Sequence, residues 1–148
     1  MEERTGQIPA RAGGGVCGIN ATEVNMERNT RQRNTILNVI SEAGRPLSTQ
    51  EIHEMGRVDV PSLSVATVYR TLKDLVAAEW ILPVRLPGEA DRYEMAKLDD
   101  HYHFKCSSCN RVFDVHERIK KNHLLAPDDF VVEKYDLILY GQCSECRQ

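Results

Sequence analysis

Two Cys-x-x-Cys pairs carry the strongest chemical signal in the sequence. Cys106 and Cys109 form the first pair, and Cys143 and Cys146 form the second. Each pair can offer two thiolates to the same ion, and four thiolates complete the tetrahedral shell of Zn²⁺ at about 2.3 Å. A thioredoxin-like redox pair would account for only one of the two motifs. The spacing therefore favours a structural zinc site that fixes the end of the chain onto the segment around Cys106.

Two histidines directly before the first pair suggest a second site. His101 and His103 are two residues apart, so in a strand both imidazoles point to one face. Glu94 and Asp114 are the nearest carboxylates that could join them. Histidine and carboxylate ligands suit Fe²⁺, Mn²⁺ or Zn²⁺ rather than Cu⁺. The alternative is a surface histidine pair beside acidic residues, with no ion. We predict two sites, one closed and one able to exchange its metal.

Composition limits the class of protein. The chain has 148 residues, of which 41% are hydrophobic and 28% are charged, and this balance is typical of one folded domain or two small ones. No apolar run approaches the roughly 20 residues of a membrane span. The N-terminus lacks the apolar core of a secretion signal, so we expect a cytoplasmic protein with no membrane partner. Its five cysteines then favour metal or redox chemistry over disulfides. The net charge of −3 requires any DNA-binding face to be locally basic.

Helical patterns dominate the first half of the chain. Residues 1–24 are glycine-rich and polar at many positions, and we expect a flexible tail there. A helix is predicted from an N-cap at Thr30 to Gly44. Ser48 and Glu51 form a capping box before a short second helix, which we expect to end at Gly56. A third helix begins after Ser64, with Val65, Val68, Leu72, Leu75 and Val76 at helical intervals.

Two short strands around a turn at Pro87-Gly88 are predicted over residues 81–95. Three helices followed by a hairpin is the order of a winged helix, whose third helix can enter the DNA major groove. We therefore expect a DNA-binding domain over residues 25–96. The alternative for its third helix is an ordinary solvated face. Arginine and lysine suit guanine edges or phosphates, and tyrosine can reach a phosphate or a thymine methyl group. The candidate contacts are Thr67, Tyr69, Arg70 and Lys73.

Residues 97–148 form the second predicted domain. Its pattern indicates strands over 101–115, a short helix over 115–125 and a strand over 130–141. The unit has few large apolar residues, so we expect it to need a metal or a second subunit. The predicted fold class is α+β: a winged helix followed by a small α/β dimerisation domain with a four-cysteine zinc site.

In this order, the segments "TRQR", "SVATVYRTLKDL", "RYE", "HYHFKCSSCNRVFDV" and "YGQCSEC" resemble the ferric uptake regulator (Fur) family of bacterial metal-responsive DNA-binding repressors. The resemblance implies a homodimer on a palindromic operator, with structural zinc on the four cysteines. It also implies a regulatory metal that joins the two domains and sets the angle between the DNA-binding heads. By position, Glu94, His101, His103 and Asp114 match its ligands. Tyr69 and Arg70 match family DNA contacts, and Arg28 resembles a basic contact to the DNA backbone.

One departure from the family pattern concerns the regulatory site. Arg45 stands where the family usually has a histidine ligand, and arginine cannot ligate a metal. Either the four remaining ligands bind an ion that exerts weaker control, or Arg45 reaches Glu94 or Asp114 and partly replaces the ion. His53, His116 and His123 are further candidate ligands, although isolated helical histidines are more often surface residues.

Other departures concern metal identity. An accessory family site that uses a histidine in the last strand is expected to be absent, because Tyr135 or Asp136 stands there. A cysteine near Glu94, common in the zinc-sensing branch, is also missing. Asp114 and the segment "DHYHF" resemble the peroxide-sensing branch. Repression that responds to iron or peroxide is therefore the preferred interpretation.

Two other classes of function compete with a repressor. The cysteines could belong to a thiol-redox or zinc-storage protein without DNA-binding activity. The histidines and carboxylates could hold a catalytic metal, but the sequence offers no accompanying nucleophile or glycine-rich cofactor loop. We therefore predict a DNA-binding repressor that is not an enzyme.

Overall fold

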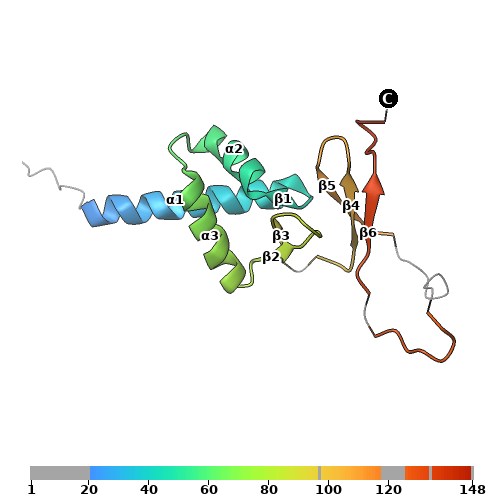
Figure 1. Cartoon of the computed structure of the whole chain (residues 1–148). Coiled ribbons are helices and arrows are strands. Elements are labelled where there is room, and N and C mark those ends of the chain that lie inside the picture. The colour runs from blue at the N-terminus through green and yellow to red at the C-terminus, as the bar shows by residue number, and fades with distance from the viewer. Residues whose placement is uncertain (1–20, 97, 118–125, 134, 148) are drawn as a thin grey trace, which may run out of the picture.

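The computed structural model describes residues 21–96, 98–117, 126–133 and 135–147. Two three-stranded sheets organise them, with strand orders β1-β3-β2 and β5-β4-β6. The helices gather around the first sheet, and the second sheet lies beside that unit (Figure 1). The elements are α1 (Ala21–Ala43), β1 (Leu47–Ser48), α2 (Thr49–Asp59), α3 (Val65–Ala77), β2 (Ile81–Val84), β3 (Arg92–Met95), β4 (Tyr102–Cys106), β5 (Val112–Val115) and β6 (Ile138–Gly141). The predicted α+β class is confirmed.

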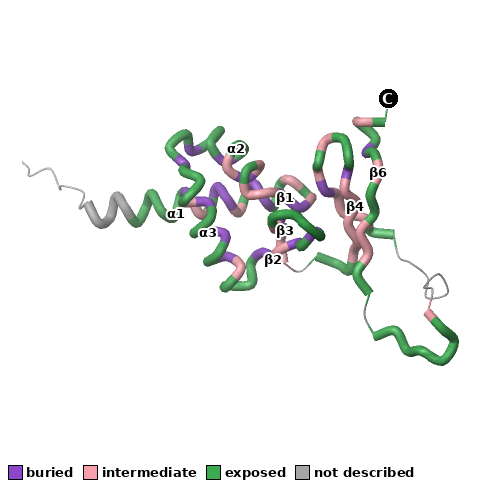
Figure 2. The backbone as a smooth tube through the Cα atoms, in the orientation of Figure 1, coloured by how far each residue is buried: buried purple, intermediate pink, exposed green. Residues whose placement is uncertain are grey.

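Helix α1 begins nine residues before its predicted N-cap. Thr30 lies inside the helix, where its hydroxyl donates to the carbonyl of Met26 at 3.0 Å. Of the tail predicted over 1–24, residues 1–20 lie outside the described residues and 21–24 are helical. Among the α1 side chains whose burial is described, from residue 26 onward, the buried apolar ones lie in the second half of the helix and include Ile36 and Ile40. Figure 2 shows the same change along α1 from exposed to buried. The extension has no apolar stripe, so hydrophobic periodicity could not reveal it.

Helix α2 confirms the capping box but not the predicted end. The Glu51 amide donates to Ser48 Oγ at 3.2 Å, and the Ser48 amide donates to Glu51 Oε2 at 2.8 Å. The helix continues past Gly56 to Asp59. A Cβ atom on Gly56 would lie 2.8 Å from Cδ2 of Leu63. Gly56 therefore allows a close approach of the following loop rather than ending the helix.

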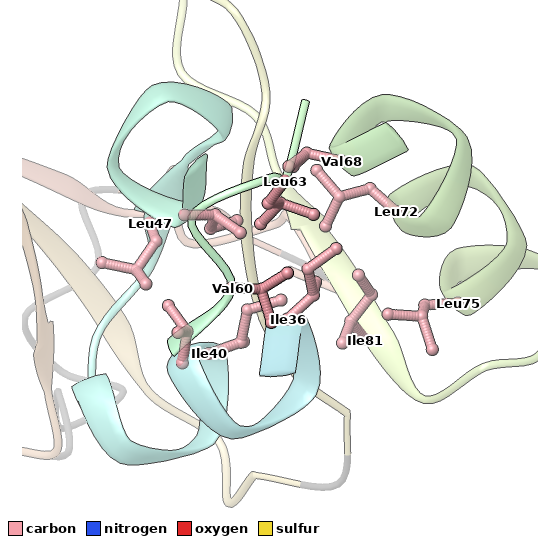
Figure 3. Close-up of a cluster of buried hydrophobic side chains, with 11 residues drawn as sticks. Ile36, Ile40, Leu47, Val60, Leu63, Val68, Leu72, Leu75 and Ile81 are labelled. Carbon is pink, nitrogen blue, oxygen red and sulfur yellow. The ribbon is translucent and has the colours of Figure 1, made fainter. Parts of the chain in front are cut away.

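Helix α3 provides one wall of the hydrophobic core. Ser64 caps it, accepting from the Thr67 amide at 3.1 Å. Val68, Leu72 and Leu75 are buried, whereas Val65 is exposed and Val76 is partly buried. Figure 3 shows these buried side chains meeting residues of α1 and β2. The buried cluster comprises Ile36, Val39, Ile40, Leu47, Ile52, Val60, Leu63, Val68, Leu72, Leu75 and Ile81.

The predicted hairpin is present, and it gains a third strand. β2 and β3 pair antiparallel, with Leu82 opposite Glu94, and Gly88 adopts a φ of 76° in the connection. β1 pairs with the other edge of β3. At two residues, β1 is too short to give an alternating pattern, so the sequence did not predict it.

The second sheet brings the two ends of the C-terminal segment together. β4 pairs antiparallel with β5 and parallel with β6. The strand predicted over 130–141 is wrong in length, because in the described part of this range the strand covers Ile138–Gly141. The helix predicted over 115–125 is wrong at its start, since Val115 ends β5, and residues 118–125 lie outside the described residues. No helix in the described part of the chain is long and apolar enough to cross a membrane.

Candidate metal and DNA-binding sites

The four paired cysteines converge where β4 and β6 end. Their Sγ atoms all lie within 4.8 Å of one another, and Cys109 and Cys143 are 3.9 Å apart. Cys106 and Cys143 are buried, whereas Cys109 and Cys146 are half-buried. The parallel β4–β6 pairing, with Cys106 opposite Gly141, carries the second pair toward the first. Four thiols around one point match the ligand set of a closed zinc site, so the cluster fits structural zinc.

Hydrogen bonds prepare part of this cluster for ionisation. Backbone hydrogen bonds from Cys109 and Cys143 lower the pKa of the Cys106 thiol to about 6. The backbone and guanidinium of Arg111 lower the pKa of Cys109, and Arg111 Nε donates to its Sγ at 3.4 Å. Contact with Cys143 raises the pKa of Cys146 to about 12. Crowded thiols cannot all ionise without a cation, because each thiolate disfavours the next.

The second cluster joins the two sheets. Glu94 comes from β3 of the first sheet, His103 and Asp114 come from β4 and β5 of the second, and His101 directly precedes β4. Glu94 Oε2 lies 3.2 Å from Nε2 of His101 and 3.1 Å from Nε2 of His103. Asp114 Oδ1 lies 3.7 Å and 3.8 Å from the same two nitrogens. One ligand atom from each residue therefore falls within 4.8 Å of the others.

The protonation of His101 explains why this cluster suits a cation. Its Nδ1 lies 2.7 Å from the carbonyl oxygen of Asp99, so this nitrogen carries the donated proton. A neutral His101 then turns the Nε2 lone pair toward Glu94 Oε2, another acceptor. In addition, Asp114 Oδ1 is buried and has no hydrogen-bond partner among the described residues. Acceptors that face one another need a proton or a metal ion between them.

Burial and the contacts between the histidines and carboxylates have opposite effects on the pKa values in this cluster. Burial alone would raise the pKa of Glu94, but hydrogen bonds from His103 and from the protonated form of His101 outweigh it, and the pKa is lowered. Burial likewise opposes protonation of His101, yet the Asp99 carbonyl and Glu94 raise its pKa. Burial raises the pKa of Asp114. Two imidazoles and two carboxylates form a donor set that fits Fe²⁺, Mn²⁺ or Zn²⁺.

Arg45 does not join the cluster. Its Nη2 donates to Glu51 Oε1 at 2.7 Å, and its Nη1 donates to the Pro46 carbonyl at 3.3 Å. The hypothesis that Arg45 bridges to Glu94 or Asp114 is therefore wrong. Glu51 captures Arg45 because the capping box already holds its carboxylate at the start of α2.

The other candidate ligands occupy different surroundings. His53 Nε2 lies 3.0 Å from the carbonyl of Leu63, in the winged helix. The His116 ring lies 5.8 Å from that of His101, beside the cluster. His123 lies outside the described residues. Tyr135, one of the two candidates for the accessory position, places its hydroxyl 2.6 Å from that of Tyr102.

The candidate DNA-contacting residues are accessible. Tyr69, Arg70 and Lys73 are exposed on α3, and Thr67 is half-buried at its start. Arg70 Nη2 lies 3.5 Å from Thr67 Oγ1, so the two polar groups are neighbours. Arg28 is exposed on α1. Arg28, Arg70 and Lys73 therefore present positive charges to solvent, although the net charge of the chain is negative.

Sequence reasoning missed a set of charged contacts between the sheets. Arg92 of β3 is buried, and its Nη2 donates to the carbonyl of Asn110 in the β4–β5 turn at 2.7 Å. Lys105 of β4 contacts Glu89 in the β2–β3 connection. The only sequence signal was the arginine of "RYE", which carries no information about a partner 18 residues away.

Comparison with known proteins agrees with this architecture. A model of the ferric uptake regulator family matches residues 25–140. The Ferric uptake regulation protein 2 of Mycolicibacterium fortuitum is 32% identical over 124 residues, which cover 80% of this chain and 85% of that one.

Solved structures share the fold. A zinc-bound manganese uptake regulator aligns with a TM-score of 0.66 at 23% identity, over 82% of this chain and 97% of that one. The Helicobacter pylori ferric uptake regulator aligns with a TM-score of 0.60 at 22% identity, over 86% and 89%. The family match and the curated relative together show that this chain belongs to the ferric uptake regulator family of metal-responsive transcriptional regulators.

Proposed function

We propose that this chain is a homodimeric repressor whose binding to a palindromic DNA operator depends on an ion at Glu94, His101, His103 and Asp114. The observation that carries the proposal is the origin of these ligands. Glu94 belongs to the sheet of the winged helix, and the others belong to the second sheet or directly precede it. An ion there would hold the two sheets together and so set the orientation of α3.

The four cysteines have a different proposed role. Cys106, Cys109, Cys143 and Cys146 would hold a structural Zn²⁺ with no open position, so this ion would stabilise the second sheet without responding to supply. The regulatory ion would be Fe²⁺, Mn²⁺ or Zn²⁺, with a response to iron or peroxide as the leading assignment. The two histidines and two carboxylates support this choice of metals.

Each of the two sheets belongs to a domain with its own proposed role. Residues 25–96 would form the DNA-binding domain and 97–148 the dimerisation domain. Exposed apolar side chains of the second unit, among them Phe130, Val131 and Tyr140, support a dimer because a second copy could cover them. The cytoplasm, where the chromosome lies, would be the site of action.

DNA contact would use one face of the winged helix. Tyr69, Arg70 and Lys73 would face the major groove with Thr67, and Arg28 would contact the backbone. Their exposure supports this assignment. We expect Arg70→Ala to weaken operator binding by about tenfold or more, the cost of a lost bidentate base contact. Arg57→Ala is the control, because Arg57 is an exposed arginine of α2 in the same domain.

The deciding experiment measures metal content and DNA affinity on the same sample. Elemental analysis before and after mild chelation would be paired with binding to duplexes selected from a random library. We expect one zinc per chain to survive chelation, and operator affinity to fall with loss of a second ion. Absence of salt-dependent, sequence-selective binding in every metal state would instead indicate a zinc-storage or thiol-redox protein.

A further inference from the structure

The side chain of Arg92 spans the two sheets. Its Nη1 donates to Glu51 Oε2 at 3.2 Å, in the winged helix. Its Nη2 donates to the carbonyl of Asn110 at 2.7 Å, one residue after Cys109. One guanidinium therefore connects the start of α2 to the turn that carries the first cysteine pair.

Both ends of this connection are fixed by their own surroundings. Asn110 has a φ of 59°, and its amide donates to the Cys106 carbonyl at 3.0 Å, which closes the turn around the cysteine pair. At the other end, Glu51 Oε2 also accepts from the Ser48 amide, and Glu51 Oε1 accepts from Arg45. Arg92 thus bridges two pre-organised groups, so little conformational entropy is lost when the bridge forms.

The Arg92 bridge is shielded from water. The side chain of Arg92 is 9% exposed and that of Glu51 is 24% exposed. Burial alone would raise the pKa of Glu51, but hydrogen bonds from Ser48 and Arg45 outweigh it and lower the pKa, so the carboxylate remains ionised. Without Glu51, the only carboxylate left beside the buried guanidinium, among the described residues, would be that of Glu89, whose Oε2 lies at the longer distance of 3.7 Å. Removing Glu51 should therefore cost more than removing one partner of an exposed ion pair.

A second contact runs in parallel. Glu89, in the β2–β3 connection, contacts Lys105 of β4, and its Oε2 lies 3.7 Å from Arg92 Nη2. Lys105 directly precedes Cys106. The Arg92–Asn110 and Glu89–Lys105 contacts both join the winged helix to the segment around the first cysteine pair. Neither involves a residue of the Glu94 cluster.

We propose that Arg92, positioned through Glu51 by Arg45, holds the winged helix against the cysteine turn without help from the ion at the Glu94 cluster. This inference rests on the proposed function, because its consequence is regulatory. The bridge maintains part of the DNA-binding arrangement in the ion-free chain. Arg45, at the position where a histidine ligand was expected, supports the arrangement through charge rather than through metal ligation.

The test compares DNA affinity with and without the regulatory ion, in chains whose structural zinc is verified by elemental analysis. For the ion-free chain, we expect Arg92→Met to weaken operator binding by about tenfold, the scale of one shielded charge-assisted hydrogen bond. Arg45→Met should weaken it less, by about threefold, since Arg45 acts only through Glu51. With the ion bound, both variants should lie within about twofold of the unchanged chain, because the ion then supplies the link.

Matched controls separate this role from general stability. Arg57→Met removes an exposed arginine and should leave the ratio of ion-bound to ion-free affinity unchanged. The variant that carries both Arg45→Met and Arg92→Met should bind the operator no more weakly than Arg92→Met alone, because both substitutions interrupt the same series of contacts. Equal losses with and without the ion, or no loss in either state, would overturn the proposal.

Small-angle X-ray scattering tests the bridge independently of DNA. In the ion-free chain that retains zinc, Arg92→Met should broaden the distribution of interatomic distances, whereas Arg57→Met should not. Unchanged scattering with Arg92→Met would overturn the bridge even if that variant bound DNA more weakly. Conversely, a clear scattering change in a chain that binds no DNA in any metal state would overturn the proposed function and leave the bridge intact.

Discussion

The two sheets of this chain are stabilised in different ways. The first sheet and its helices enclose a cluster of eleven buried hydrophobic residues. In the described part of the chain beyond residue 97, the buried hydrophobic residues are Cys106, Val112 and Cys143, and two of these are candidate zinc ligands. The winged helix can therefore fold by burying apolar surface, whereas the second sheet has few buried apolar residues of its own and, in the function proposed above, would be stabilised by metal and by a second copy.

The sharpest test of this difference removes the structural zinc. Cys143→Ser should abolish tight zinc binding and unfold the second sheet, since structural zinc contributes roughly 10–16 kcal/mol in small domains. Hydrogen exchange should then increase in β4, β5 and β6, while α1 to α3 remain protected. Cys17→Ser is the control, because Cys17 belongs to neither pair. Retained protection of β4 would show that this sheet folds without zinc.

The converse substitution weakens the apolar core. Leu72→Ala should destabilise the winged helix by about 2–5 kcal/mol, because Leu72 is fully buried and its loss leaves a cavity. Denaturant unfolding followed by Trp80 fluorescence would measure the change, and zinc content should not alter. Val58→Ala, at an 81% exposed position, should cost far less. Loss of zinc from Leu72→Ala would mean that the two regions do not fold separately.

Asp114→Asn tests the cluster between the two regions. We expect the affinity for the regulatory ion to fall by about 10- to 100-fold, and ion-dependent DNA binding to fall with it. Titration with Mn²⁺ or Zn²⁺ on zinc-retaining chain would measure the affinity, with Asp129→Asn as an exposed acidic control. If the ion affinity stayed the same while the chain became more stable, Asp114 would be an unsatisfied buried acid rather than a ligand.

The smallest expected effect concerns the cap that orients Glu51. Ser48→Ala removes the side-chain half of the capping box and should reduce the free energy of unfolding by about 1 kcal/mol. Thermal or urea unfolding would detect it, with the exposed Ser62→Ala as control. Zinc retention should be unchanged. A loss above about 2 kcal/mol would indicate that the hydroxyl also stabilises the Arg45–Glu51–Arg92 contacts.

Local spacing in the sequence determined the parts of this protein that depend on near neighbours. Four features can be recognised from residue types at fixed, short spacings along the chain. They are the two Cys-x-x-Cys pairs, the two-residue spacing of His101 and His103, the Ser48 capping box and the apolar stripe of α3. The grouping of Glu94 with the histidines and Asp114 was also predicted, and the structure brings these four together. Their role as metal ligands stays a prediction.

Tertiary structure alone decided the features that depend on distant partners. Arg45 pairs with Glu51 rather than Glu94, and Arg92 reaches a residue 41 positions away on one side and 18 on the other. The N-terminal extension of α1 and the two-residue strand β1 likewise left no periodic signal. A long charged side chain can reach several carboxylates, and its choice depends on which one the folded backbone has already fixed nearby.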